Sequence, residues 1–112
     1  MAELPSGNLF AAITRGARDE RFDLLAQSAE TRVERIVSTG QASPPGFWYD
    51  QPEDEFVVLL SGAARLRLEP GDRLLDMKPG DWIDIPARCR HRVEATQADP
   101  PTVWLVVHRK RS

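Results

Sequence analysis

The chain has 112 residues, a charged fraction of 29% and a net charge of −2 at pH 7. This length fits one domain, and the low net charge excludes a global field that would attract nucleic acid or an anionic membrane. The one cysteine, Cys89, excludes an internal disulfide and zinc motifs with paired cysteines. Residues 1–10 lack the features of a signal peptide, and the longest apolar run, 56–60, is too short to span a bilayer. We therefore expect a cytoplasmic protein without nucleic-acid or membrane partners.

Residues 1–30 are expected to form an N-terminal arm that packs on the rest of the chain. Residues 8–13 are a candidate short strand. Residues 18–28 show a weak helical pattern, in which two acidic residues precede apolar ones, as is common in the first turn of a helix. The apolar positions are Phe22, Leu24 and Leu25. The sequence therefore predicts a short strand followed by a short helical segment.

From residue 31 onward, short runs rich in Val, Ile, Leu and Trp alternate with turns that contain Gly, Pro or Asp. This spacing is typical of strands in an all-β sandwich or barrel. The predicted strands are residues 31–38, 55–60, 63–69, 73–77, 82–85, 91–96 and 102–108. No long linker divides them, so they are expected to form one domain.

Two of these strands carry apolar side chains on both faces. They comprise residues 56–60 and 103–107. An antiparallel strand of this kind needs cover on both sides. The outer cover is either a second copy of the chain or the chain's own N-terminal helical segment, and the sequence leaves both alternatives open. The first alternative predicts a homodimer.

Two spaced motifs lie in the middle of the chain. In the first, Glu55 is followed by six residues and then by Gly62. In the second, Gly80 is followed by five residues and Pro86, and His91 follows further on. These motifs resemble the two sequence motifs of the cupin family, and the chain is similar to small single-domain bacterial cupins of unassigned function. The resemblance implies an all-β fold, the double-stranded β-helix or jelly-roll-like barrel.

The resemblance extends through the supporting strands and implies one barrel domain over residues 31–112. Gly46 matches the leading glycine of the first motif. Two positions of the second motif differ from the family: Arg88 stands where the family has a glycine, and Ala95 stands where it has an asparagine. The motifs therefore match best at the positions that build the barrel.

The family's metal site consists of two His, a Glu and a third His. By resemblance, the Glu is Glu55 and the third His is His91. The two leading positions fall on Tyr49 and Gln51, which share one face of an extended chain with Glu55. A spacing longer by one residue would place them on Trp48 and Asp50 instead, and this alternative requires a bulge.

The set Tyr49, Gln51, Glu55 and His91 retains one carboxylate and one imidazole. A neutral phenol and an amide oxygen are weaker donors for first-row divalent ions than imidazole. The resemblance therefore implies a weakly held divalent metal, such as Mn, Fe, Zn or Ni, rather than a full metal centre.

Three interpretations of this cluster stay open. It could hold a divalent metal; it could be a metal-free pocket for a small polar metabolite, with Glu55 and His91 as hydrogen-bonding or acid–base groups; or it could be a filled barrel with a structural role. The resemblance also allows an enzyme of the isomerase, lyase or dioxygenase type, with Glu55 and His91 as catalytic residues. His108 is a further candidate for the pocket, because neighbouring strands of a barrel can bring distant residues together.

The remaining candidates are expected to be structural. Alternation along the strand places at least two of Arg88, Arg90 and Arg92 on a solvated face, and Cys89 fits a buried structural thiol better than a catalytic one. Large aromatic residues in a small barrel usually pack in the core or in a dimer contact. In this chain they include Trp48, Trp82 and Trp104.

Overall fold

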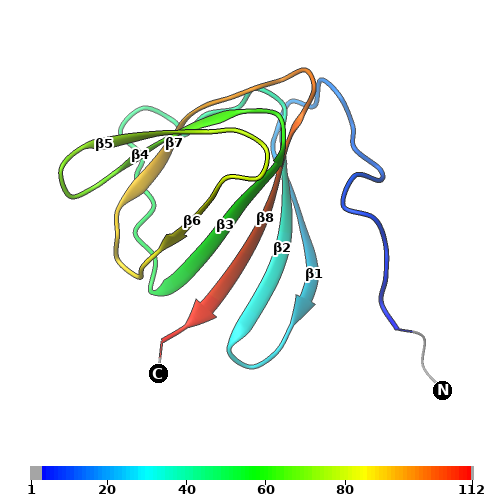
Figure 1. The fold of residues 1–112 in the computed structure, drawn as a ribbon, viewed down its shortest axis with the longest axis horizontal. Coiled ribbons are helices and arrows are strands. Elements are labelled where there is room, and N and C mark those ends of the chain that lie inside the picture. Colours follow the sequence, from blue (N-terminus) through cyan, green and yellow to red (C-terminus); the bar gives the residue numbers. More distant parts are fainter. Residues whose placement is uncertain (1–3, 112) are drawn as a thin grey trace.

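The computed structural model describes residues 4–111 and consists of eight antiparallel strands without a helix in that range (Figure 1). The strands are β1 (Arg21–Gln27), β2 (Thr31–Ser38), β3 (Glu53–Ser61), β4 (Ala64–Leu68), β5 (Arg73–Met77), β6 (Trp82–Ile85), β7 (His91–Thr96) and β8 (Thr102–Lys110). The predicted all-β fold is therefore confirmed. Because residues 4–111 contain no helix, none of them belongs to a helix that could cross a membrane.

The strands form two sheets that face each other in a jelly-roll-like barrel (Figure 1). The larger sheet has the order β1-β2-β8-β3-β6 and the smaller has the order β5-β4-β7. Alternate residues of each strand point between the sheets, as strand geometry requires. The core consists of Val57, Leu59, Ala64, Leu66, Leu68, Met77, Ile85, Trp104 and Val106. The inner face of the larger sheet thus supplies both core residues and, at one end, the polar side chains described below.

The predicted N-terminal helix is wrong, because residues 21–27 form the edge strand β1. Phe22 pairs with Ile36 and Leu24 pairs with Glu34 of β2, and a bulge follows Leu24. The apolar residues at 22 and 24 are separated by Asp23, so they fit an alternating strand as well as a helix. Pairing with β2 satisfies the backbone of the segment and decides between the two.

The predicted strand at residues 8–13 is also wrong, because residues 9–12 form a turn. The Asn8 side chain accepts a hydrogen bond from the Phe10 amide at 2.7 Å, and the Asn8 carbonyl accepts one from the Ala11 amide at 3.0 Å. Asn is well suited to closing such a turn with its own side chain. The expected division of the chain into residues 1–30 and 31–112 stays a prediction.

Gly62, in the turn between β3 and β4, lies against β8. Its φ is +81°, and an added Cβ would stand 2.5 Å from Thr102 Oγ1 and 2.6 Å from Thr102 Cα. Thr102 is fully buried, and its hydroxyl donates to the Gln97 carbonyl at 2.8 Å and accepts from the Gln97 amide at 3.1 Å. Thr102 cannot move away from an added Cβ without breaking these two hydrogen bonds. Only glycine therefore fits at position 62.

The outer face of the larger sheet is covered only in part. The N-terminal segment lies over one end, where the buried Arg35 guanidinium donates to the carbonyls of Leu9 at 3.1 Å and Ala11 at 2.6 Å. Further along, Trp82 is 63% exposed and stacks on Phe56, with ring centroids 5.3 Å apart. Four apolar side chains near Trp82 and Phe56 on this outer face are half-buried: Val58, Leu60, Leu105 and Val107. Cover of this face by an N-terminal helix is excluded, since residues 18–28 form no helix.

The homodimer remains a prediction, and the outer apolar face is the surface that a second copy would cover. We expect a mass of about twice 12.6 kDa in solution, and we expect Trp82→Glu to shift it to that of the monomer because a buried, unpaired charge is costly in an interface. Light scattering coupled to size exclusion measures the mass. Leu74→Glu, at an exposed position of the smaller sheet, is the control and should stay dimeric. A monomeric parent protein would contradict the prediction.

Gly62→Ala should lower the free energy of unfolding by about 2–4 kcal/mol, because it combines a strained backbone with a clash against the Thr102 backbone. Urea titration followed by tryptophan fluorescence measures the loss. Gly80→Ala is the matched control, since its φ is +95° but nothing lies within 4 Å of an added Cβ. It should lose only the backbone contribution, about 1–2 kcal/mol. Equal losses in both variants would show that the contact with Thr102 does not matter.

Candidate functional site

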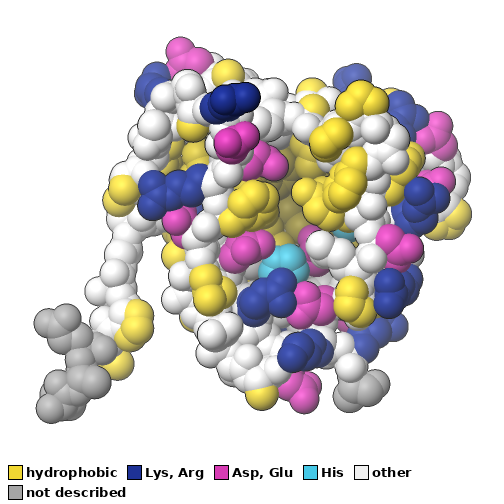
Figure 2. All heavy atoms as spheres, turned by 180° about the vertical axis from the view of Figure 1, so that it is seen from behind, with side chains coloured by type: hydrophobic (Ala, Val, Ile, Leu, Met, Phe, Trp, Pro, Cys, Tyr) yellow, Lys and Arg dark blue, Asp and Glu magenta, His cyan; other side chains and the backbone are white. Residues whose placement is uncertain are grey.

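A cavity of about 110 Å³ lies between the two sheets. Figure 2 shows this hollowed face of the molecule, with hydrophobic side chains deep inside and Asp, Glu and His side chains around the opening. The apolar part of its wall includes Val57, Leu66 and Val106, which also belong to the core. The cavity is therefore a continuation of the core toward one open end of the barrel.

The four residues predicted to form the site all line this cavity: Tyr49, Gln51, Glu55 and His91. Glu55 lies on the inner face of β3, with Val57 and Leu59 next in the same alternation. His91 is the first residue of β7 and is 7% exposed. Tyr49 and Gln51 lie before β3, outside its regular part, and their side chains nevertheless line the same cavity as Glu55. Their roles as catalytic or metal-binding residues stay predictions.

An isolated β-bridge places the segment of Tyr49 against the start of β7. The Tyr49 amide donates to the His91 carbonyl at 2.7 Å, and the His91 amide donates to the Tyr49 carbonyl at 3.2 Å. The Tyr49 and His91 rings stack with centroids 5.3 Å apart. The Arg88 amide, at a φ of 65°, donates to the Gln51 carbonyl at 2.8 Å. These bonds hold two residues of an irregular segment in the wall of the cavity.

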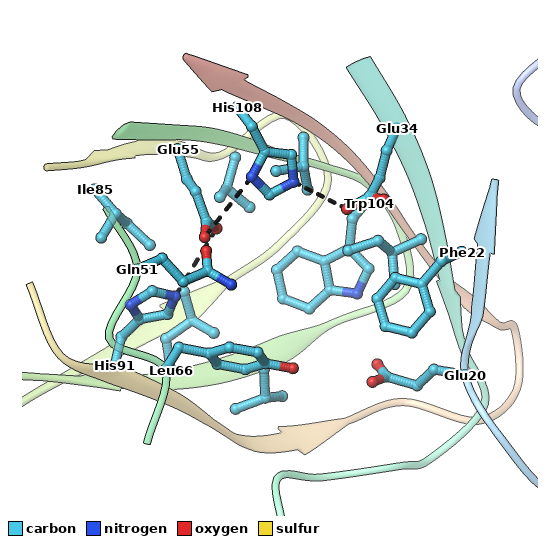
Figure 3. A pocket seen from close by; sticks show the side chains of 15 residues that line it. Glu20, Phe22, Glu34, Gln51, Glu55, Leu66, Ile85, His91, Trp104 and His108 are labelled. Carbon is cyan, nitrogen blue, oxygen red and sulfur yellow. Dashed lines mark hydrogen bonds and ion pairs between the residues drawn. The ribbon is translucent and has the colours of Figure 1, made fainter. Parts of the chain in front are cut away.

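His108 joins the cavity from the inner face of β8, where it pairs directly with Glu55 of β3. Its Nε2 lies 2.9 Å from Glu34 Oε1, and its Nδ1 lies 3.9 Å from Glu55 Oε1. His91 approaches the same carboxylate from the other side, with Nε2 3.9 Å from Glu55 Oε2. Figure 3 shows Glu55 between the two imidazoles. The sequence offers His108 only as a further candidate for the pocket. In the structure it lines the cavity directly opposite Glu55.

Besides apolar core residues, sequence reasoning left out the polar and aromatic lining residues Glu20, Phe22, Glu34 and Trp104. Glu34 shares the inner face of β2 with Ile36, so strand alternation could have indicated it. Glu20 and Phe22 were missed because their segment was interpreted as a helix. Trp104 was assigned to packing, and it does pack in the core, but its ring also forms part of the cavity wall.

The hydrogen bonds of the two histidines define their neutral tautomers. His91 Nδ1 lies 2.9 Å from the Cys89 carbonyl, which can only accept, so Nδ1 carries the proton. By the same argument, the Glu34 carboxylate places the proton of His108 on Nε2. Each neutral imidazole therefore directs an acceptor nitrogen toward Glu55.

Burial raises the pKa of the Glu55 carboxyl, and the charges of Glu34 and Glu53 act in the same direction, while His91 and His108 oppose them. Burial also raises the pKa of the Tyr49 phenol, and the carboxylates of Glu20, Glu55 and Glu34 add to this effect. Tyr49 is therefore a neutral phenol at neutral pH. An ionisable carboxyl with a raised pKa in a cavity is a common feature of functional sites.

The sequence profile of the cupin domain matches residues 34–108. The chain belongs to the cupin family. A crystal structure of a Ralstonia eutropha JMP134 protein, with a provisional assignment as a mannose-6-phosphate isomerase, is 51% identical to this cupin. It superimposes with a TM-score of 0.91 over 95% of this chain and 98% of its own. Among proteins of curated function, none matches this sequence.

More distant structures show the same fold. A cupin superfamily protein from Desulfitobacterium hafniense DCB-2 is 19% identical and has a TM-score of 0.73, with 88% of this chain and 84% of its own covered. The polyketide cyclase RemF from Streptomyces resistomycificus is 20% identical and has a TM-score of 0.69, with 87% and 69% covered. At this level of identity the likeness concerns the fold alone.

The residues of this cupin do not fit the metal ion that the family implies. Within residues 4–111, no three His, Cys, Asp or Glu side chains are grouped closely enough to hold an ion. The 3.9 Å separations of His91 and His108 from Glu55 exceed the roughly 3.4 Å between two ligands of a tetrahedral ion at bond lengths of about 2.1 Å. Moreover, the two histidines face opposite oxygens of the carboxylate, and Tyr49 is a neutral phenol.

None of the three arginines near His91 lines the cavity, and alternation predicted this for at least two of them. Arg88 lies 3.4 Å from Asp50, Arg90 lies 3.0 Å from Glu69, and Arg92 lies 2.9 Å from Glu94. The Cys89 thiol donates to the Glu69 carbonyl at 3.1 Å and does not line the cavity. These residues therefore stabilise the surface around β7 and contribute no positive charge to the cavity wall.

Glu55→Gln should stabilise the protein at neutral pH. Because the folded-state pKa of Glu55 is raised, the native state binds more protons than the unfolded state above about pH 4.5, and stability falls as pH rises toward the folded-state pKa. We expect the melting temperature at about pH 8 to rise by roughly 2–4 °C, which corresponds to about 0.5 kcal/mol in a domain of this size. The difference should shrink toward about pH 4, where Glu55 is protonated in both states.

Asp54→Asn is the matched control for this measurement. The hydrogen bond from Arg111 lowers the pKa of Asp54, and a bond from the Ala87 amide at 2.7 Å adds to the effect. A lowered pKa stabilises the fold above the unfolded-state pKa. Asp54→Asn should therefore lower the melting temperature at neutral pH. A change in melting temperature in the same direction for both substitutions would contradict the argument that burial destabilises the Glu55 carboxylate.

Proposed function

We propose that this cupin binds a small polar molecule in the cavity between its two sheets. The observation that carries the proposal is a pair of buried polar atoms at the cavity wall, Gln51 Oε1 and His108 Nδ1, which have no hydrogen-bond partner among the described residues. Nearly all buried polar groups in folded proteins are hydrogen-bonded. A polar ligand next to Glu55 would satisfy both atoms.

The size of the cavity limits the ligand. At about 110 Å³ it is somewhat smaller than an engineered cavity of about 150 Å³ that accepts benzene. By this comparison the space inside the barrel fits about four or five non-hydrogen atoms, and a larger molecule would extend through the opening. The mixed wall, apolar in the interior and polar around Glu55, is typical of small-molecule sites.

A second candidate is an enzyme of the isomerase type, and the provisional assignment of the 51% identical relative favours it. The Glu55 carboxylate would then take a proton from one atom of the substrate and, as the carboxylic acid, return it to a neighbouring atom, while His91 Nε2 would accept a hydrogen bond from a substrate hydroxyl. The raised pKa of Glu55 suits proton transfer near neutral pH. This candidate needs no group other than the side chains that line the cavity.

The double variant Glu55→Gln/His91→Ala tests both candidates. Protein-observed NMR with a panel of small amines, polyols and D-mannose 6-phosphate should give at least one binder whose shifts map to the cavity. The double variant should weaken that binder by about tenfold or more, because hydrogen bonds to a charged group are lost. Conversion of D-mannose 6-phosphate to the ketose is followed in parallel.

The matched control is Glu69→Gln, a carboxylate outside the cavity that pairs with Arg90 at 3.0 Å, and it should leave binding unchanged. Turnover that the double variant abolishes would establish the isomerase candidate. Binding without turnover in the parent protein would eliminate it. If every compound that binds the parent protein binds the double variant equally well, the proposed site is contradicted.

A further inference from the structure

We infer that the cavity selects a small organic cation, a primary amine in its ammonium form, with the ammonium group next to Glu55. This inference rests on the binding function proposed above and specifies the class of ligand. It depends on three properties of the cavity: unpaired acceptors converge on one point, the wall holds three carboxylates and no described Lys or Arg, and aromatic rings form part of the wall.

The atoms that converge at Glu55 are all hydrogen-bond acceptors. They are the Glu55 carboxylate, the acceptor nitrogens His91 Nε2 and His108 Nδ1, and Gln51 Oε1. The two nitrogens stand 3.9 Å from the carboxylate oxygens, too far for a direct hydrogen bond. No hydrogen bond joins these atoms to one another, and two of them, Gln51 Oε1 and His108 Nδ1, have no partner among the described residues. An ammonium group has three donors and no acceptor, so it complements this arrangement.

The charges on the cavity wall favour a cation. Glu20, Glu34 and Glu55 line it, whereas the described lining residues include no Lys or Arg. Arg32 is near the same end of the barrel, since it pairs with His108 across β2 and β8, but its guanidinium binds both oxygens of Glu53, at 3.1 and 2.9 Å. A buried carboxylate without a counter-charge is costly, and a cationic ligand would provide that counter-charge.

Aromatic side chains surround the same space. Phe22, Tyr49 and Trp104 line the cavity, and ring faces attract ammonium groups through cation–π interactions. The Trp104 indole is held by a bond from Nε1 to Ser38 Oγ at 3.1 Å, and Ser38 in turn donates to Glu20. Figure 3 shows Phe22, Trp104 and Glu20 together on the side of the cavity away from Glu55. An elongated amine would thus meet rings beyond its ammonium group.

The same features disfavour an anion. Phosphate and carboxylate ligands are normally bound by Arg, Lys or clustered backbone amides, and none of the described Lys or Arg residues lines this cavity. Three carboxylates would repel a phosphate group. The cavity of this chain therefore suits an amine better than the sugar phosphate that the provisional assignment of its relative suggests.

A series of probes with similar shape and different charge tests the inference. Butylammonium, butanol and butyrate are titrated separately by calorimetry and by NMR, together with D-mannose 6-phosphate and MnCl₂ alone. We expect butylammonium to bind at the cavity and to be preferred over butanol by about tenfold or more, because an ion pair is added to the hydrogen bonds. Butyrate and D-mannose 6-phosphate are expected not to bind.

Glu34→Gln and Glu20→Gln remove one charge each while preserving shape, and both should weaken butylammonium binding; Glu69→Gln should not. Stronger binding of butanol, butyrate, the sugar phosphate or Mn²⁺ than of butylammonium would overturn the inference. So would the absence of butylammonium binding. If one of those other probes binds and the Glu55→Gln/His91→Ala variant abolishes its binding, the proposed function stands although the inference fails. If neither the single variants Glu34→Gln and Glu20→Gln nor the double variant changes the binding of any probe, both the inference and the proposed function fail.

Discussion

The alternation of side chains along β3 is the constraint on which the rest of the site depends. Val57 and Leu59 must point between the sheets, because they form the centre of the core. Glu55 lies two residues before Val57 and therefore points the same way. The pairing of β3 with β8 on one side and β6 on the other leaves it no other direction. The carboxylate is buried because the hydrophobic core requires it.

The neighbouring residues reduce the cost of that burial without removing it. His108 and His91 stand on opposite sides of the carboxylate, each at 3.9 Å, so neither closes a salt bridge or a hydrogen bond with it. Glu34 fixes the ring of His108 but also adds a second negative charge. A barrel selected for stability alone would fill this end with apolar side chains. Retention of a partly compensated carboxylate is the pattern expected where stability is traded for a site.

Much of the fold could be predicted from local patterns, because apolar runs mark the strands and Gly, Pro and Asp mark the turns between them. Four of the predicted strands, among them residues 73–77 and 91–96, have the observed bounds. The helix predicted at residues 18–28 was wrong because apolar residues at 22, 24 and 25 fit both a helical and a strand periodicity. Only pairing with β2 decides between the two. In the site, Tyr49, Gln51, Glu55 and His91 were predicted from the resemblance to the cupin motifs, and parity selected the positions of the first two. The position of His108 opposite Glu55 could not be predicted, because it depends on the register between β3 and β8, which are far apart in the chain.

The cupin barrel and the chemistry within it are determined by different residues. Gly62 and the core of the two sheets define the barrel, and they match the family. Tyr49 and Gln51 change the donors at the positions where the family carries histidines, and His108 brings an imidazole from another strand. The second imidazole thus faces Glu55 from β8, opposite His91, and the carboxylate lies between two acceptors. This arrangement suits the hydrogen-bond donors of a ligand better than a metal ion, whose ligands must all lie about 2 Å from one point. The chemistry of the cavity therefore depends on the positions of the two imidazoles more than on the cupin fold.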